Sequence, residues 1–402
     1  SELGIDTLDG MASLTDESLI RPAMAGDASG RNGDSESRFE MLQVIREFAG
    51  EKLDAAADAD EIRRRHARHF LSLADEAEPH LVRAGLQFWQ HRLRREEENL
   101  RTALRWALDH GEAELGLRMA GALWRFWHYW GEFREGARWL ESFLALPAAA
   151  APTQARALGL SALAGIRFWQ GDVPHATALY EEALPIYRTV GDDRQIAEAY
   201  HTTAWAALAR QDYATARERG EAALEHYRRA EDRVGLALVT AWLRTGEYLT
   251  GLGGDAASAV AAAREAVEVF RDMGTRYDEA DWLGTLAMVH ERAGDHASAW
   301  RVFREAVQVN HQIRNLGTLP WFKFGAKLEL ARGSPERAAV LAAIAERSIE
   351  ESGGELPVLI TGGGDPLAEA RALLPPDAYE RAVAEGRAMT IDQAVAYVLE
   401  KE

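Results

Sequence analysis

Residues 169–183 read WQGDVPHATALYEEA, and this stretch contains the pattern that decides the fold. Gly171 and Asp172 mark a turn, and alanines follow four and eleven residues after the aspartate, at Ala176 and Ala183. Alanines seven residues apart lie two turns apart on one face of a helix. A helix face lined by such small side chains lets another helix pack closely against it. The stretch therefore predicts a helical hairpin whose second helix begins near residue 172.

The same arrangement returns about every forty residues through the middle of the chain. Its turn residues are Asp172, Asp212, Asp255, Asp295 and Ser334, spaced by 40, 43, 40 and 39 residues. An alanine pair follows each at the same offsets: Ala176/Ala183, Ala216/Ala223, Ala259/Ala266, Ala299/Ala306 and Ala338/Ala345. A fixed period of this size is typical of stacked helical hairpins and not of a single globular core. We expect an all-α chain that forms a right-handed α-solenoid.

The helix before each turn has a small position of its own, eight residues before the turn residue. It holds Ala164, Ala204, Glu247, Ala287 and Ala326. Four of these five side chains are small, so the two helices of a hairpin can approach closely. Most turns also carry a glycine, which favours left-handed backbone, whereas the second turn has Gln211.

Composition limits the kinds of partner that the chain can bind. The 402 residues include 27% charged ones and carry a formal net charge of −18. Phosphate binding needs a basic surface, so this balance disfavours nucleic acid and anionic membranes. The basic cluster at residues 63–69 lies in a helical pattern and is interpreted as a solvated helix face. The absence of cysteine excludes thiol catalysis and disulfides, and no apolar run reaches the length of a membrane span. These features favour a cytoplasmic protein.

Four regions of the chain differ in character. Residues 1–48 combine apolar positions with a loop rich in Gly, Asp and Ser; residues 49–150 are helical and end in a degenerate first hairpin; residues 151–350 hold the clear repeats; residues 351–402 begin with glycines and prolines and continue as a short helical cap. Three helices are expected over 41–57, 62–79 and 86–110, a hairpin over 114–130 and 134–146, and terminal helices over 377–386 and 390–399. Thr390 and Gln393 predict a capping box for the last helix.

The first region has the order of the last part of a winged helix. A short amphipathic helix around Met11 and Leu14 leads into a strand at 18–22. A mobile loop at 23–37 precedes a returning strand at 38–42, and a helix follows. The loop would be the wing. Because it is acidic, we expect no direct DNA binding by this segment.

The repeats resemble the tetratricopeptide repeat. The similarity is clearest at Trp169-Gln170-Gly171-Asp172 and at Arg292-Ala293-Gly294-Asp295, each followed by its alanine pair. The period near forty departs from the usual spacing of about 34 residues in that family. Longer helices or connectors account for the difference.

A second resemblance covers almost the whole chain. Residues 14–20 (LTDESLI) and 38–49 (RFEMLQVIREFA) look like the end of the winged helix that follows the ATPase module in bacterial STAND-type regulators. Residues 97–107 (EENLRTALRWA) and 386–395 (GRAMTIDQAV) are also similar to that family, which includes LuxR-type and antibiotic-regulatory activators. The resemblance implies a sensor region that controls nucleotide-dependent assembly. The chain begins at Ser1 without a Met and has no G-x-x-x-x-G-K-[ST], so we expect a piece of a longer protein whose ATPase module lies elsewhere.

In tetratricopeptide arrays, the first helix of each hairpin lines the concave groove. The resemblance places candidate site residues at fixed offsets before each turn residue. They are Phe168, Trp169, His201, Trp205, Arg244, Tyr248, Glu291, Arg292, Lys323 and Lys327, and the same offsets also give Glu198, Leu208, Asp281 and Met288. Aromatic and charged side chains in one groove suit a peptide or a small molecule with a charged group. The alternative is that the aromatic residues pack between neighbouring hairpins.

Three further features are better explained by packing than by chemistry. Trp242, Trp282 and Trp321 share one repeat position and are expected in the core. The aromatic run 124–130 is either a buried helix or an aromatic pocket at the mouth of the array. His66 and His69 lack a third metal ligand at a fixed spacing, so no metal site is expected. No nucleophile motif appears either.

We therefore expect a non-catalytic, cofactor-free sensor region that binds a protein partner or a small effector in its groove. Its other partner would be the ATPase module of the same full-length protein, and self-association is compatible with this role. The alternative is a tetratricopeptide scaffold that holds a peptide segment of another protein.

Overall fold

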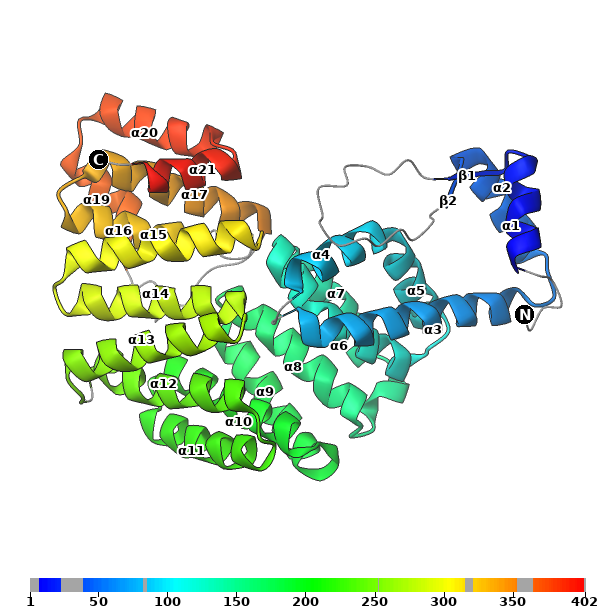
Figure 1. The fold of residues 1–402 in the computed structure, drawn as a ribbon, viewed down its shortest axis with the longest axis horizontal. Helices are drawn as coiled ribbons and strands as arrows, with labels where there is room; N and C mark the ends of the chain where they lie inside the picture. The colour runs from blue at the N-terminus through cyan, green and yellow to red at the C-terminus, as the bar shows by residue number, and fades with distance from the viewer. Residues whose placement is uncertain are drawn as a thin grey trace. The chain divides into compact units, whose positions relative to one another are not determined.

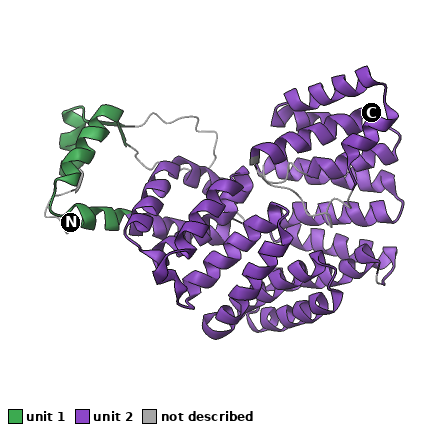
Figure 2. Ribbon diagram, turned by 180° about the vertical axis from the view of Figure 1, so that it is seen from behind, with its two compact units in different colours: residues 1–66 green, residues 67–402 purple. Residues whose placement is uncertain are grey.

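A computed structural model describes residues 7–22, 39–81, 85–251, 253–314, 321–352 and 364–400. The expected wing at 23–37 and the stretch 353–363, rich in glycine and proline, lie outside these ranges. The chain forms two compact units, residues 1–66 and residues 67–402 (Figure 2). In the described ranges almost every element is a helix, so the all-α prediction is confirmed.

The first unit has the expected order of helix, strand, strand, helix. Helix α1 (Thr7–Asp16) precedes β1 (Ile20–Pro22), and β2 (Phe39–Met41) precedes α2 (Gln43–Asp54). The two strands pair antiparallel, with Ile20 opposite Met41. Helix α3 (Ala59–Ala77) begins in this unit and continues into the second.

After α3, the second unit continues with a short 3-10 helix (Glu78–His80) and with two α-helices where the sequence predicted one. The single helix predicted over 86–110 is wrong: α4 (Leu86–Arg95) ends at Glu96, and α5 (Glu97–Asp109) begins after it. The backbone at Glu96 has φ −98° and ψ 5°, outside the helical range. Leucine spacing continues across this bend, because Leu93 and Leu100 are both buried on their own helices. The apolar pattern therefore gave no sign of the break.

Six hairpins then follow one another along the chain and stack in sequence order (Figure 1). Their helices are α6 (Ala113–Trp130) with α7 (Phe133–Leu144), α8 (Gln154–Trp169) with α9 (Val173–Val190), α10 (Asp193–Ala209) with α11 (Tyr213–Arg229), α12 (Arg233–Thr250) with α13 (Ala256–Asp272), α14 (Arg276–Arg292) with α15 (His296–Gln312), and α16 (Phe322–Ala331) with α17 (Pro335–Ser352). This arrangement is the solenoid of tetratricopeptide-like hairpins that the forty-residue period predicts.

The recurring aspartates act as helix N-caps. The side chains of Asp172, Asp212, Asp255 and Asp295 accept hydrogen bonds from the backbone N–H groups three residues later, at distances of 2.9 to 3.2 Å. Each bond satisfies an N–H group that has no partner within the helix. The residue before the cap is left-handed in every repeat, including Gln211 at φ 63°. A non-glycine residue there is strained but tolerated at a single turn.

The repeated alanines lie where the helices of a hairpin meet. All ten members of the five pairs are buried, and the most exposed, Ala306, is 5% exposed. Larger side chains at these positions would force the two helices apart. The small residues of the first helices, Ala164, Ala204, Ala287 and Ala326, are fully buried as well.

The C-terminal region packs against the last hairpins as a cap. It contains α19 (Pro366–Leu373), which was not expected, then α20 (Pro376–Ala388) and α21 (Ile391–Leu399). The capping box of Thr390 and Gln393 is confirmed. The guanidinium of Arg337 lies 4.6 Å from the ring centre of Tyr397, and His311 contacts the Asp392 carboxylate at 2.7 Å. These contacts fasten α21 to α15 and α17. Across the described ranges, no helix is long and apolar enough to cross a membrane.

Candidate functional site

A cavity of about 220 Å³ lies on the inner side of the stacked hairpins. We call it the inner cavity. Its walls come mainly from the first helices of successive hairpins, α6, α8, α10, α12 and α14. The lining comprises Trp124, Arg125, Phe168, Trp169, Tyr180, His201, Thr202, Trp205, Leu208, Leu238, Trp242, Thr245, Gly246, Leu249, Thr250, Tyr277, Asp278, Asp281, Trp282, Thr285, Met288 and Trp321.

The inner cavity exists because the solenoid curves until an early and a late hairpin meet. The rings of Tyr129 on α6 and Tyr277 on α14 lie 5.2 Å apart between centroids. His128 also contacts Tyr277, at 5.9 Å between ring centres. We call the contact of α6 with α14 at Tyr129 and Tyr277 the seam. In addition, the side-chain amide of Gln87 on α4 donates to the backbone carbonyl of Gln312 on α15. The ring contacts bring α14 against α6, and both helices contribute to the lining of the inner cavity.

Two glycines make room for indole rings in the wall. A Cβ atom on Gly165 of α8 would lie 3.0 Å from the ring of Trp124, and one on Gly284 of α14 would lie 2.7 Å from that of Trp321. Both distances are too short for an undisturbed side chain. The glycines therefore fix where two of the six cavity indoles lie.

The wall is unusually rich in aromatic rings. Six tryptophans line the inner cavity, together with Phe168, Tyr180 and Tyr277. Trp205 lies 5.9 Å from Trp242 and 6.2 Å from Phe168, measured between ring centroids. Aromatic faces at these spacings offer a broad apolar surface with negative potential at the ring faces.

One guanidinium and two carboxylates interrupt this aromatic wall. Arg125 stacks on the ring of Trp124, with its guanidinium carbon 4.5 Å from the ring centre. Asp278 and Asp281 lie one helical turn apart on α14, and both reach the cavity. Burial, and then the neighbouring Asp278 carboxylate, raise the pKa of Asp281 to about 7, although Arg125 and a hydrogen bond from Tyr277 act in the opposite direction.

His201 in the wall is held neutral. Its Nε2 atom accepts a hydrogen bond of 3.0 Å from the indole N–H of Trp205, so the ring proton is on Nδ1. Burial, and then the positive charge of Arg125, lower the pKa of His201 to about 4. The same two causes lower the pKa of the buried His128 to about 3. Among the described residues of the lining, the charged side chains are therefore those of Arg125, Asp278 and Asp281.

The structure brings together four of the ten sequence-predicted site residues. Phe168, Trp169, His201 and Trp205 all line the inner cavity. Leu208, Asp281 and Met288, which the same offsets identify, line it as well. The rule that the first helix of each hairpin faces inward therefore selects wall residues in the second, third and fifth hairpins.

The other six residues lie elsewhere. Arg244 borders a second cavity, of about 260 Å³, between α11 and α12, and its guanidinium is 3.5 Å from the Glu265 carboxylate. Arg292 lies over the ring of Tyr248, 5.7 Å from its centre. Glu291 on α14 and the half-buried Lys323 and Lys327 on α16 are outside the lining of both cavities.

Sequence reasoning missed Arg125 and Asp278. A signal for Arg125 was present, because it lies seven residues before Glu132, which occupies the turn position of the first hairpin. Trp205 has the same offset from Asp212. The degenerate first hairpin lacks the aspartate and the alanine pair, so its register was not extended to the groove. Asp278 lies in the first turn of α14, beyond the offsets considered.

The tryptophans that share one repeat position are core residues and also line the inner cavity. Trp242, Trp282 and Trp321 are between 4% and 9% exposed, as expected for core residues, yet all three reach the inner cavity. The aromatic run at 124–130 divides in a similar way. Trp127 and Tyr129 are buried in α6, whereas Trp124 faces the cavity.

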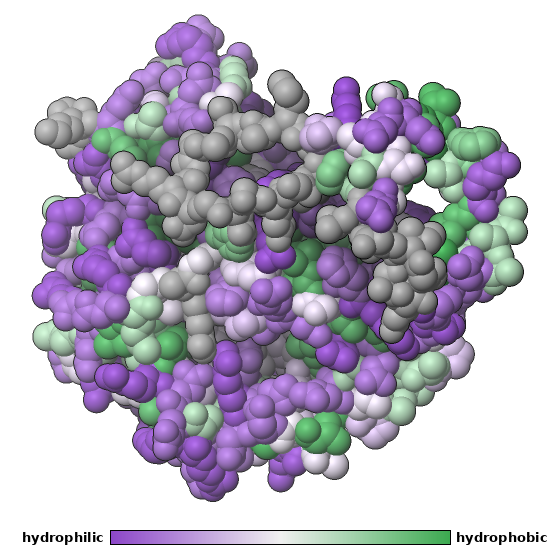
Figure 3. Space-filling model, turned by 45° about the vertical axis from the view of Figure 1, so that its right-hand side comes forward, coloured by the Kyte–Doolittle hydropathy of each residue, from purple (hydrophilic) through white to green (hydrophobic). Residues whose placement is uncertain are grey.

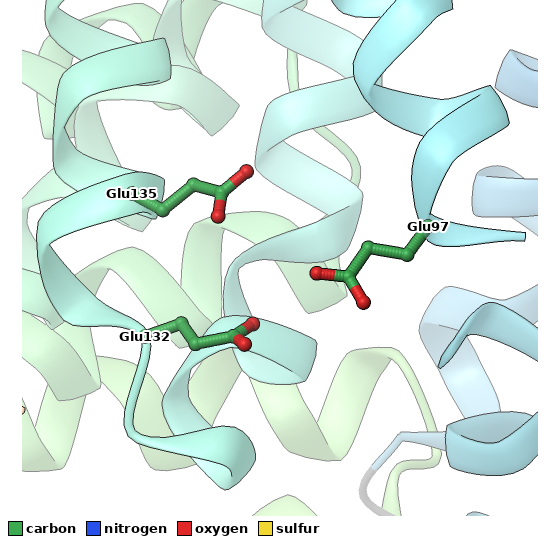
Figure 4. Close-up of side chains that lie close together, drawn as sticks. All are labelled: Glu97, Glu132 and Glu135. Atoms are coloured by element: carbon green, nitrogen blue, oxygen red, sulfur yellow. The ribbon is translucent and has the colours of Figure 1, made fainter. Parts of the chain in front are cut away.

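A group of three carboxylates elsewhere in this unit has the spacing of a metal site and forms ion pairs with two arginines. Glu97 of α5 points toward Glu132 and Glu135, at the start of α7 (Figure 4). Arg94 lies 2.7 Å from Glu132 and 3.0 Å from Glu97, and Arg101 lies 2.7 Å from Glu135. Burial, and then Glu132, raise the pKa of Glu97. The arrangement is an ion-pair network that joins α4, α5 and α7.

Figure 3 shows one face of the molecule, on which hydrophilic side chains predominate among the described residues and hydrophobic ones occur in small separate groups. Several exposed apolar side chains belong to the first unit, among them Leu42, Val44 and Phe48 on or just before α2. The inner cavity, with its aromatic walls and charged groups, is the candidate site of the second unit.

Comparison with known proteins agrees with the fold. Residues 154–229 match the tetratricopeptide repeat family. A crystal structure of a Rap protein complexed with Competence and Sporulation Factor aligns with 83% of this chain and 99% of its own, with a TM-score of 0.51 and 16% sequence identity. At this identity, the likeness concerns the fold alone.

Related sequences occur among mycobacterial regulators. Proteins from Mycobacterium bovis and Mycobacterium tuberculosis, each described as a "Putative HTH-type transcriptional regulator", are 27% identical over 312 residues. The match covers 74% of this chain and 33% of each relative. The chain thus spans about a third of the length of the curated relatives it matches.

Proposed function

We propose that this chain is the effector-binding region of a STAND-type transcriptional regulator and that the inner cavity receives the effector. The observation that carries the proposal is the cavity itself, which combines aromatic walls with Arg125 on α6 and two carboxylates on α14. Pockets that are mostly apolar, with a few convergent polar groups, are typical of small-molecule sites. The similarity to mycobacterial transcriptional regulators supports the regulatory part.

The proposed mechanism is a shift between two states of the full-length protein. An effector in the inner cavity contacts α6 and α14, which close the seam at Tyr129 and Tyr277. It therefore stabilises the closed seam relative to an open one. Differential affinity for two states is the condition for a ligand to control a distant module. That module would be an ATPase outside this chain, and the chain itself binds without catalysing a reaction.

A scaffold that holds a peptide of a partner protein is the second candidate. The second cavity favours it, because its charged residues Arg217, Glu221 and Arg244 are exposed and accessible to an extended segment. The Rap protein with a similar fold is complexed with Competence and Sporulation Factor. A peptide bound at the second cavity would not require the contact between α6 and α14.

The two candidates are separated by ligand screening on the full-length gene product. A sensor shows an increase in thermal stability with a small effector, and this effector changes its ATPase rate. A scaffold responds to a peptide and not to small molecules. A gene that encodes no P-loop ATPase module together with this chain would contradict the STAND proposal.

A further inference from the structure

We infer that the inner cavity is built for a small organic cation, an amine or quaternary ammonium compound, that lies between the indole rings and the Asp278–Asp281 pair. The inference rests on the proposed function, because it names the class of effector for the same site. It is carried by two observations: the aromatic surfaces of the lining, and the placement of both carboxylates on one wall.

Among the described residues of the lining, the charged groups are the guanidinium of Arg125 and the carboxyl groups of Asp278 and Asp281. The histidine in the lining, His201, is neutral because Trp205 donates to its Nε2 atom. Burial, and then the Asp278 carboxylate, disfavour the ionised form of Asp281 and raise its pKa. A ligand cation beside this carboxyl group would favour its ionised form.

The aromatic walls suit the same ligand. Trp205 and Trp242 are adjacent on one side of the cavity, and Trp282 on α14 lies in the same helix as the two carboxylates. A cation is attracted to the faces of such rings, and the attraction grows when water is excluded. The face of Trp124 already carries Arg125, at 4.5 Å, so this kind of contact occurs within the cavity.

An anionic ligand fits less well. Among the described residues of the lining, its cationic partner would be Arg125, and Glu198 and Asp278 already act electrostatically on that guanidinium. An anion would also meet the carboxylate of Asp281 in a site of low polarity, where like charges repel strongly. The observations therefore favour the cation, and the anion becomes an outcome of the test.

Binding of a cation should also depend on pH through Asp281. The groups that face it are Asp278 and Tyr277 on its own helix, and Arg125 and Tyr129 from α6. His201 from α10 and Tyr180 from α9 line the same cavity, and Glu198 acts on Arg125 from α10. A ligand cation favours the ionised carboxylate, so binding releases a proton when the pH is below about 7. Affinity should rise with pH up to that value and then level off.

The test uses three probes of similar shape: benzyltrimethylammonium, benzyl alcohol and phenylacetate. Binding to the full chain is measured by calorimetry and by quenching of tryptophan fluorescence. The variants are Asp278→Asn and Asp281→Asn, with Asp272→Asn, an exposed aspartate at the end of α13, as the matched control. We expect benzyltrimethylammonium to bind most tightly and each cavity variant to weaken it about tenfold or more, whereas Asp272→Asn leaves it unchanged.

The weak binding of benzyl alcohol serves as the folding control, because a variant that retains it has an intact cavity. If Asp281→Asn does not fold, the pH dependence of the wild-type protein gives the same test without a substitution. Phenylacetate binding tighter than benzyltrimethylammonium, with quenching, would overturn the cation inference but leave the cavity as an effector site. Failure of all three probes up to roughly 10 mM would overturn the inference and also weaken the proposed function.

Discussion

The phenol rings of Tyr129 and Tyr277 lie 5.2 Å apart and join the first hairpin of the solenoid to the fifth. Both side chains are at most 5% exposed, and the planes of their rings meet at 66°. The contact lies beside the inner cavity, because Tyr277 belongs to its lining. The contact therefore joins the two helices that carry the charged groups of the lining, Arg125 on α6 and the aspartates on α14.

Tyr277→Ala should open the seam between α6 and α14. The loss of a buried aromatic ring costs about 3 kcal/mol or more of unfolding free energy, measured by denaturant titration. Tyr277→Phe keeps the ring contact, removes only the hydroxyl that bonds Asp281, and should cost much less. Equal losses in the two variants would contradict a packing role for the ring.

Asp281 should make stability fall as pH rises. Its folded-state pKa, about 7, is above the ordinary value of 3.8, so between these values the folded protein binds more protons than the unfolded chain. Stability is then lost as pH rises from about 4 to 7 and is constant above. His201, with a pKa lowered to about 4, has the opposite effect between about 4 and 6.5. The difference in unfolding free energy between Asp281→Asn and wild type isolates the contribution of the Asp281 carboxylate to this pH dependence.

This difference should shift in favour of Asp281→Asn as the pH is raised from 4 to 7. A pH-independent difference would show that Asp281 is ionised in the folded protein throughout this range.

Asp255→Ala tests the capping role of the recurring aspartates. The substitution removes the acceptor for the Ser258 N–H group, at 2.9 Å, and should cost about 1 kcal/mol of unfolding free energy. Asp272→Ala, at the other end of the same helix, removes an exposed carboxylate and should be close to neutral. Similar effects at the two ends would argue against the capping explanation.

Gly284→Ala tests how tightly the wall is built. The new methyl group would lie 2.7 Å from the ring of Trp321, so the indole must move. We expect a loss of about 1–3 kcal/mol and a changed tryptophan emission spectrum. Gly246→Ala is the control, since a Cβ atom there has no neighbour within 4 Å and a helix interior favours alanine over glycine. An unchanged spectrum for Gly284→Ala would mean that the wall is looser than the structure indicates.

The repeat pattern predicted most of the fold, because the helix N-caps and the alanine contacts depend on residues that are close together in the sequence. Asp172 and Ala176 have the same local role in the structure as in the sequence pattern. The bend at Glu96 was missed because apolar residues are buried on both sides of it. A hydrophobic stripe in the sequence shows which face of a helix is buried, but it does not show whether the helix axis continues straight.

The site was harder to predict than the fold. Offsets from the turn residue identified Trp205 and Asp281, since both lie on the inward faces of regular first helices. They also selected Arg244 and Lys327, which lie outside the inner cavity, because the curvature that closes the cavity depends on contacts between distant hairpins. No single repeat encodes the meeting of Tyr129 with Tyr277. Periodicity therefore gives the inner face but not the part of it that is enclosed.

Trp205→Ala and Arg244→Ala separate the inner cavity from the second one. If the effector occupies the inner cavity, Trp205→Ala weakens binding by about tenfold or more, and Arg244→Ala has little effect. Binding is measured by calorimetry, with circular dichroism to verify that helicity is unchanged. The reverse order of effects would favour the peptide scaffold.

The most direct measurement is a crystal structure of the full chain grown with benzyltrimethylammonium. We expect ligand density inside the inner cavity, with the ammonium group between the ring of Trp205 and the carboxylate of Asp281 and with the Tyr129–Tyr277 seam closed. A cavity without ligand density at a saturating concentration, or ligand density confined to the outer surface, would contradict it.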